Sequence, residues 1–324
     1  MKTILAAALV VSVSLASVSL AHAQFYPSKP VRIVTPNAPG VSTDLLARGM
    51  ADRFQKVWGQ PVLVENRAGA NGVIGTDAVA KSAPDGYTLL VHPAGVFTFH
   101  PALYDKLPYD VLRDFTPISQ LANTPIWVVV NPSLPVKTLA ELIAYAKAQP
   151  GKLSYSTVGG TIGLPYLSSV VMQNTAGAKM EYVNYKGGNQ AITDLLGNQI
   201  QVMFDAVPGS LQHVKSGRLR ALAVVSPRRM QAMLELPTIA EAGVPEASGQ
   251  AWNAISTRAG TPPEIVRRIS ADSMAAVRDP EFAQKLSAIG FEIVGNTPEE
   301  FLAVVKAEMA KWGKVIRDNN IKAE

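Results

Sequence analysis

The first hundred residues after residue 23 alternate between short apolar runs and amphipathic segments. Val31–Thr35 is an apolar run of strand length, whereas Asp44–Val57 places Leu46, Met50 and Phe54 on one helical face. The expected elements are strands at 31–35, 61–65 and 87–91, with helices at 44–57 and 73–82 between them. Near-continuously apolar strands separated by helices predict a parallel sheet covered on both faces.

A second alternating set follows residue 125. Its expected strands are 126–130, 153–156, 181–184, 199–204 and 219–225, and its helices are 139–148, 164–175, 191–196 and 211–215. A strand at 252–257 is followed by helices at 263–277, 280–288 and 298–319. Two such sets predict an α/β fold of two lobes, each a sheet flanked by helices, with a ligand cleft between them.

The lobes are expected to be discontinuous in sequence. The first comprises residues 24–122 and 252–324, and the second comprises residues 123–251. The chain then crosses between the lobes twice, near 122–125 and 248–257.

Residues 1–23 have the pattern of a secretory signal peptide. Lys2 supplies the positive start, Ile4–Leu20 the apolar stretch, and Ala21-His22-Ala23 a small-x-small cleavage site. A transmembrane anchor is the alternative, but the stretch contains four serines and no charge cluster follows it. The sequence therefore predicts export to the periplasm, cleavage after Ala23 and no membrane insertion of the mature chain.

Composition and motifs argue against several kinds of function. The chain has no cysteine, and its net charge of +5 comes from scattered basic residues, which disfavours nucleic acid as a partner. His92 and His100 have no acidic neighbour to complete a metal site. Gly159–Gly163 resembles a nucleophile elbow with threonine in place of serine, but only His213 lies downstream as a base. We expect no catalytic residue, metal or cofactor, and a monomer that binds a ligand without transforming it.

Two glycine-rich turns, at Pro36–Asp44 and Thr157–Gly163, each follow a strand and open a helix. Unpaired N–H groups and hydroxyls meet at such a turn and suit an anionic ligand, although a plain helix start that binds nothing has the same pattern. The candidate ligand contacts are Ala38, Gly40, Val41, Ser42, Thr43 and Asp44 in the first turn, and Ser156, Gly160, Thr161, Ile162 and Gly163 in the second.

Two further candidates lie after strands of the second set. Tyr185 precedes two glycines and is expected to cover one face of a ligand. Asp205 ends an apolar strand and is expected to point toward the cleft, with helix capping as the alternative.

Several segments together resemble the receptors of the tripartite tricarboxylate transporter family, also called Bug receptors. The resemblance covers essentially the whole chain after the signal peptide, and its segments are 36–48, 59–67, 69–75, 83–90, 185–188, 193–197, 203–205, 236–243 and 252–263. It implies a type II-like periplasmic binding protein that closes on a small organic carboxylate for a membrane permease. The family's carboxylate-gripping loops correspond to Ala38–Asp44 and Ser156–Gly163.

The chain departs from the family pattern at two positions. Val41 replaces a glycine of the first turn, and Tyr166 replaces a histidine after the second. The changes favour an aromatic or short aliphatic carboxylate. An exported sensor that signals to a membrane kinase remains an alternative to a transport receptor, and a secreted hydrolase is a more distant one.

Overall fold

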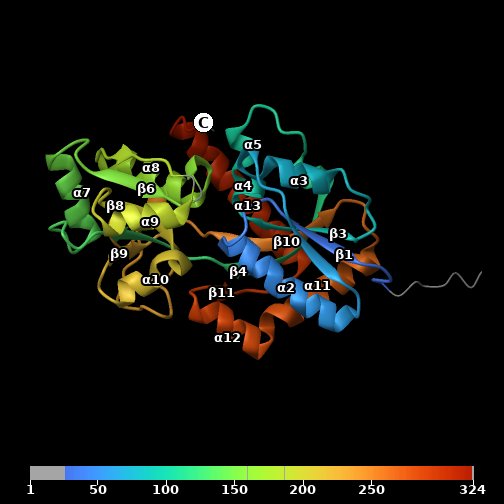
Figure 1. The fold of residues 1–324 in the computed structure, drawn as a ribbon. Helices are drawn as coiled ribbons and strands as arrows, with labels where there is room; N and C mark the ends of the chain where they lie inside the picture. The colour runs from blue at the N-terminus through green and yellow to red at the C-terminus, as the bar shows by residue number, and fades with distance from the viewer. Residues whose placement is uncertain (1–25, 159, 186, 323–324) are drawn as a thin grey trace, which may run out of the picture.

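The computed structural model describes residues 26–158, 160–185 and 187–322. The predicted signal peptide, residues 1–23, lies outside these ranges. Two β-sheets flanked by helices form two lobes side by side (Figure 1). This is the α/β, two-lobed fold that the alternating pattern predicted. No helix in the described ranges combines the length and apolar character needed to cross a membrane.

The first sheet has six strands in the order β11-β4-β10-β3-β1-β2. The strands are β1 (Val31–Thr35), β2 (Val62–Asn66), β3 (Thr88–Pro93), β4 (Phe115–Asn123), β10 (Trp252–Arg258) and β11 (Glu292–Ile293). The helices of this part of the chain are α2 (Ser42–Trp58), α3 (Val73–Ala80), α4 (Gly95–Thr98), α5 (His100–Leu103), α6 (Val111–Asp114), α11 (Pro263–Arg278), α12 (Pro280–Ala288) and α13 (Pro298–Asp318). A 3₁₀ turn, η1 (Ala70–Gly72), precedes α3.

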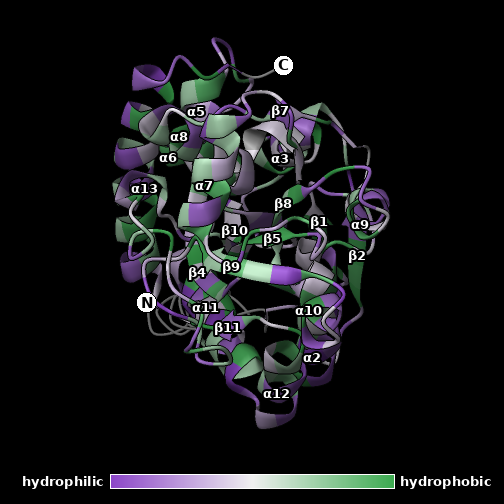
Figure 2. Cartoon of the chain, turned by 90° about the vertical axis from the view of Figure 1, so that its left-hand side faces the viewer, coloured by the Kyte–Doolittle hydropathy of each residue, from purple (hydrophilic) through white to green (hydrophobic). Residues whose placement is uncertain are grey.

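The second sheet has five strands in the order β7-β6-β8-β5-β9. The strands are β5 (Ile126–Val130), β6 (Ser154–Thr157), β7 (Glu181–Tyr182), β8 (Val202–Ala206) and β9 (Arg220–Val224). Its helices are α7 (Leu139–Ala148), α8 (Leu164–Ala176), α9 (Gly188–Leu196) and α10 (Val207–Lys215), with short 3₁₀ turns η2 (Gly160–Ile162) and η3 (Pro245–Ala247). Strand β5 is buried along its whole length and is mostly hydrophobic, whereas the surrounding helices carry both hydrophobic and hydrophilic residues (Figure 2).

The three strands expected to form a parallel sheet do so, but the first sheet as a whole is mixed. β1 pairs in parallel with β2 and β3, but β10 pairs antiparallel with both β3 and β4, and β11 pairs antiparallel with β4. The reason is that β10 arrives from the second lobe and not through a right-handed crossover helix. The second sheet is also mixed, because β5 runs antiparallel to β8 and β9.

Helix α13 contributes to the hydrophobic core of each lobe. Phe301 and Val305, near its start, pack with residues of the first sheet such as Val34. Trp312 and Ile316, near its end, pack with residues of the second sheet. The lobe boundaries at residues 122 and 252 stay predictions, and α13 adds a structural link between the lobes beyond the two expected crossings.

Candidate functional site: a cavity between the lobes

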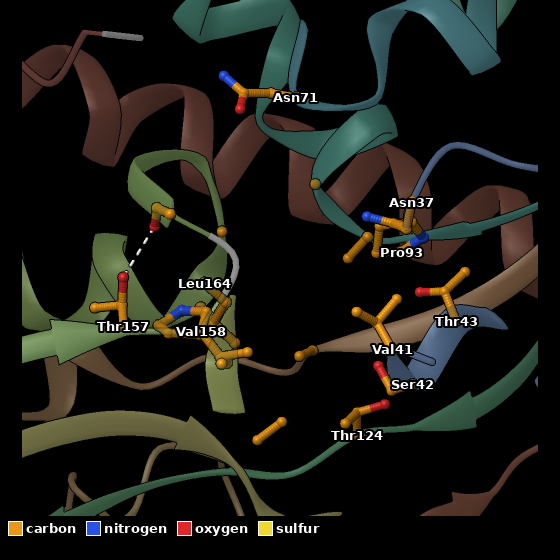
Figure 3. A pocket seen from close by; sticks show the side chains of 18 of the residues that line it. Asn37, Val41, Ser42, Thr43, Asn71, Pro93, Thr124, Thr157, Val158 and Leu164 are labelled. Carbon is orange, nitrogen blue, oxygen red and sulfur yellow. Dashed lines mark hydrogen bonds between the residues drawn. The ribbon is translucent and has the colours of Figure 1, made fainter. Parts of the chain in front are cut away.

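A cavity of about 630 Å³ lies where the two lobes face each other (Figure 3). One wall comes from the segments after β1 and β3 and from the start of β10, and the other from the segments after β6, β7 and β8. Ligands of sheets with parallel strands bind outside the carboxyl ends of those strands, and these segments occupy that position. The cavity is therefore the candidate ligand site.

The first predicted turn is held in shape by Asp44, which is buried at 2 % exposure. Its Oδ2 accepts hydrogen bonds from the Gly40 amide at 2.9 Å and from Arg48 Nε at 3.0 Å, and its Oδ1 accepts one from Asn66 Nδ2 at 2.8 Å. Burial by itself would raise the pKa of Asp44, but the hydrogen bonds from Arg48, Gly40 and Asn66 outweigh it and the pKa is lowered. Asp44 thus stabilises the turn through hydrogen bonds and does not line the cavity.

We predict that Asp44→Ala lowers the free energy of unfolding by about 2–3 kcal/mol, because it removes a charge-assisted acceptor from three donors. Since the folded pKa is depressed, this stabilisation is present at neutral pH and is lost as the pH falls through the folded pKa. Urea-induced unfolding at pH 7 measures the effect. Asp52→Ala, at an exposed position of the same helix, is the matched control and should stay within about 0.5 kcal/mol of the wild type. Equal stability of the two variants would contradict the structural role of Asp44.

A chain of buried polar side chains joins the first turn to both crossings. Thr43 Oγ1 donates to Asn253 Oδ1 at 2.6 Å, and Asn253 Nδ2 donates to Thr124 Oγ1 at 2.8 Å. The backbone amide of Thr124 donates to the Ala251 carbonyl at 2.9 Å. All four residues line the cavity. The start of α2 is therefore hydrogen-bonded to Asn253 at the start of β10 and, through it, to Thr124 between β4 and β5.

The second predicted turn forms the opposite wall. Thr157 Oγ1 donates to the Gly160 carbonyl at 2.9 Å, which closes the turn (Figure 3). Thr161 follows in η2 and lines the cavity at 8 % exposure. Gly160 has φ +72, a left-handed conformation that glycine adopts without strain. The turn thus presents the Thr161 side chain and backbone groups to the cleft.

Four helices begin at the cavity wall. The residues immediately before α2, α8, α9 and α10 are Val41, Gly163, Gly187 and Ala206, and all four line the cavity. In none of these described helices does the residue before the first turn cap it with a side-chain hydrogen bond. The first N–H groups of a helix lack internal partners and carry the positive end of its dipole. The cavity therefore offers amide donors from both lobes to an anion.

Charged side chains are absent from the described wall of this cavity: none of its lining residues is Asp, Glu, Lys or Arg. His100 also lines it, but burial lowers the pKa of His100 to about 4, so its ring is neutral at pH 7. Hydroxyls and amides provide the polar part of the wall, and the apolar part includes Val41, Phe99, Ile126 and Leu164. In the described ranges no three metal-binding side chains cluster together.

The structure brings together most of the residues that were expected to contact a ligand. Those that line the cavity are Ala38, Val41, Ser42, Thr43, Gly160, Thr161, Gly163 and Tyr185. The Tyr185 hydroxyl donates to Asp194 Oδ2 at 2.7 Å, which fixes its ring at the wall. Ile162 lies in η2 between two lining residues.

Five expected contacts lie elsewhere. Gly40 is an exposed residue of the first turn, and its amide donates to the buried Asp44. Ser156 is fully buried in β6, and none of these three residues lines the cavity. Tyr166 packs edge-on against Tyr182, with ring centroids 5.2 Å apart.

Asp205 is the fifth. It is 1 % exposed, and its Oδ2 accepts a hydrogen bond from Ser210 Oγ at 2.5 Å, beneath the start of α10. In the cleft wall its place is taken by the next residue, Ala206.

Other lining residues had not been singled out. They are Asn37, Asn71, residues 93–96, Phe99, His100, Thr124, Asn184 and Asn253, among others. Pro93 ends β3 and residues 94–96 follow it, so the rule that ligands bind beyond carboxyl strand ends would have found them. Thr124 and Asn253 lie at the two crossings, and no sequence spacing connects them.

Comparisons with known proteins identify the family of the chain. Residues 46–321 match the family model described as "Tripartite tricarboxylate transporter family receptor". Protein BugT of Bordetella pertussis is 36% identical over 301 residues, covering 93% of this chain and 92% of BugT.

Solved structures agree as well. "Structure of a periplasmic transporter" has 37% identity and a TM-score of 0.84, covering 92% of this chain and 99% of that one. R. palustris Rpa4515, solved with adipate, has 34% identity and a TM-score of 0.84, covering 92% of this chain and 99% of that one. MatC of Rhodopseudomonas palustris, solved with malate, has 28% identity and a TM-score of 0.81, covering 90% of this chain and 100% of that one. The chain belongs to the receptor family of the tripartite tricarboxylate transporters, and its fold is that of a periplasmic solute-binding protein.

Proposed function

We propose that this protein captures a small organic carboxylate in the cavity between its lobes, closes on it, and delivers it unchanged to a membrane permease of the tripartite type. It works in the periplasm as a monomer, after removal of residues 1–23. The ligand carboxylate is held between the two turns by Ser42, Thr161 and the amides at the starts of α2 and α8.

The observation that carries the proposal is the set of helix starts from both lobes around a cavity whose described lining residues include no Asp, Glu, Lys or Arg. A carboxylate that leaves water must recover its hydration through hydrogen bonds, and charge-assisted ones contribute roughly 1.5–3 kcal/mol each. Four or five such bonds suffice for micromolar binding, which requires about −8 kcal/mol. The amides and hydroxyls at the wall are numerous enough to supply them.

The known relatives support the same class of ligand. The solved structures with adipate and malate each hold a small dicarboxylate in a protein of this fold. The family description supports a transport permease as the partner. A sensor role with a membrane kinase would use the same closed form, so capture of membrane proteins from an extract, with and without ligand, separates the two.

We expect one carboxylate in a thermal-shift screen to bind in a 1:1 ratio and to be recovered chemically unchanged. At 100 times its Kd it should stabilise the protein by about 2.7 kcal/mol. Thr161→Ala should weaken binding of that compound by about 1.5–3 kcal/mol in calorimetry, since it removes a hydroxyl from the wall.

Thr193→Ala is the matched control, because Thr193 is exposed on α9 away from the cavity wall. It should bind like the wild type. Equal binding by Thr161→Ala, or recovery of a modified compound, would overturn the assignment of the site or of the function respectively.

A further inference from the structure

The loop at Gly69–Gly72 has an unusual backbone conformation at the edge of the cavity. Its four residues all have positive φ: 134° for Gly69, 44° for Ala70, 57° for Asn71 and 94° for Gly72. Left-handed conformations strain residues with a side chain, and asparagine tolerates them better than alanine. Strained backbone of this kind occurs where the surrounding structure imposes it, often at ligand sites.

Close packing leaves little room for a side chain at either glycine of the loop. A Cβ added to Gly69 would lie 2.7 Å from Ile74 Cδ1, and one added to Gly72 would lie 3.1 Å from Val96 Cγ1. The loop is thus packed closely against the start of α3 and against α4. Asn71 is the residue of this loop that reaches the cavity wall.

Asn71 lies at the opposite end of the cavity from the hydroxyls of Ser42 and Thr124. Figure 3 shows Ser42 and Thr124 at one end and Asn71 at the other. Val41, Val158, Leu164 and Pro93 lie between them in the same view, with Asn37 beside Pro93. The cavity therefore has a polar end, a mostly apolar middle and a second polar end that consists of the Asn71 amide.

The Asn71 amide is anchored from outside the cavity. Its Nδ2 donates to the Tyr104 hydroxyl at 2.9 Å, just after the end of α5. This leaves Oδ1 on the side of the cavity, as Figure 3 shows. A phenol both donates and accepts, so the amide and the hydroxyl can reverse together and present Nδ2 instead. The pair then satisfies either a hydroxyl or a carboxylate on a ligand, and it offers nothing to a methyl group.

We infer that Asn71 is a specificity residue that binds the far end of the ligand. The inference rests on the proposed function, because it takes one ligand carboxylate to be held at the helix starts. The ligand class is then a short apolar chain with a carboxylate at one end and a second hydrogen-bonding group, hydroxyl or carboxylate, at the other. At this end the described lining offers the second group the hydrogen bonds of an amide.

The experiment compares carboxylates of four to eight carbons in three matched forms: alkanoates, ω-hydroxyalkanoates and α,ω-dicarboxylates. Calorimetry should show the purified protein binding the two ω-polar forms about five- to tenfold more tightly than the alkanoate of equal length, as expected for one hydrogen bond. In Asn71→Gly this preference should fall below about twofold while alkanoate affinity is unchanged. Glycine suits the positive φ at this position, so the variant keeps the backbone of the loop.

Asn198→Gly is the matched control, since Asn198 has the same φ of 57° and is exposed on the second lobe outside the cavity wall. It should keep the full preference. Tyr104→Phe removes the anchor of the amide and should reduce the preference by about half.

The outcomes separate the two proposals. A preference that survives in Asn71→Gly, or that is missing in the wild type, overturns the role of Asn71 while carboxylate capture stands. Loss of alkanoate binding in Asn71→Gly also overturns it, because Asn71 would then shape the pocket and not read the far end. If the wild type binds no member of the series, carboxylate capture fails as well.

Discussion

Replacing Trp312 by alanine is expected to lower the free energy of unfolding by about 3–5 kcal/mol, the range for removing a large buried aromatic side chain. The Trp312 ring has no exposed surface and meets Phe99 edge-on, with ring centroids 5.5 Å apart. Its Nε1 donates to Glu308 Oε2 at 2.7 Å. A Cβ added to Gly249 would lie 2.5 Å from Trp312 Cζ2, so the ring rests directly on that backbone.

This position matters for function because Trp312 lies where the lobes share a core. Leu164, which begins α8 and lines the cavity, belongs to the same hydrophobic cluster as Trp312 and Phe99. A hole at Trp312 therefore loosens the base of the cavity as well as the contact between the lobes. Ligand binding should weaken along with stability.

Urea-induced unfolding of three variants tests the prediction. Trp312→Phe keeps most of the packing but loses the Glu308 hydrogen bond, so it should cost less than Trp312→Ala. Lys314 lies two residues after Trp312 on the same helix, and its exposed side chain forms an ion pair with Asp318. Lys314→Ala should therefore stay within about 0.5 kcal/mol of the wild type. A loss below about 1 kcal/mol for Trp312→Ala would mean that the ring is not part of a shared core.

Local pattern accounts for most of the fold. The bounds of β5, α7 and α12 agree with those expected, because β5 is a bounded apolar run and the two helices have an apolar face and a residue that caps them. β4 (Phe115–Asn123) was missed. Pro117 interrupts its pattern and lies at an irregularity in the pairing with β10, which tolerates a residue without an N–H.

The site was predictable where it depends on local turns. The hydroxyls and amides of both glycine-rich turns lie at the cavity because a turn from strand to helix presents them there. The contacts between Thr43, Asn253 and Thr124 join segments up to 210 residues apart, and no local pattern encodes them.

The expectation for Asp205 depended on the direction of a single side chain. Successive residues of a strand point to opposite faces, so a shift of one position exchanges wall and core. At the end of β8 it is Ala206 that reaches the cavity, while Asp205 lies opposite Trp127 in the sheet. Apolar runs without alternation do not reveal which parity applies.

The buried Asp205 gives the protein a distinctive dependence of stability on pH. Burial raises the pKa of Asp205 to about 7, against the weaker lowering effect of its hydrogen bonds with Ser210 and the Ala206 backbone. Trp127 Nε1 donates to the same Ser210 hydroxyl at 2.9 Å. In the unfolded chain the carboxyl has its ordinary pKa of about 3.9. The protonated form is thus the one that the folded protein prefers.

Because the folded pKa lies above the unfolded one, the stabilisation is complete below pH of about 4 and is lost as the pH rises through about 7. Three pKa units correspond to a loss of up to about 4 kcal/mol by pH 8. Asp205→Asn keeps a neutral side chain of the same shape, so its stability should not show this decline and should exceed that of the wild type at pH 8. Urea-induced unfolding at pH 5, 6, 7 and 8 measures both proteins.

The difference between wild type and Asp205→Asn is the quantity that isolates this residue. Burial also raises the pKa of Glu308, so the slope of the wild type alone combines two carboxyls that titrate in the same sense. Ser210→Ala removes the hydroxyl that stabilises the ionised form and should shift the decline to higher pH. Parallel stability curves for the wild type and Asp205→Asn from pH 5 to pH 8 would show that Asp205 ionises without cost. Such a carboxylate would be reached by water, as the expectation of a side chain facing the cleft requires.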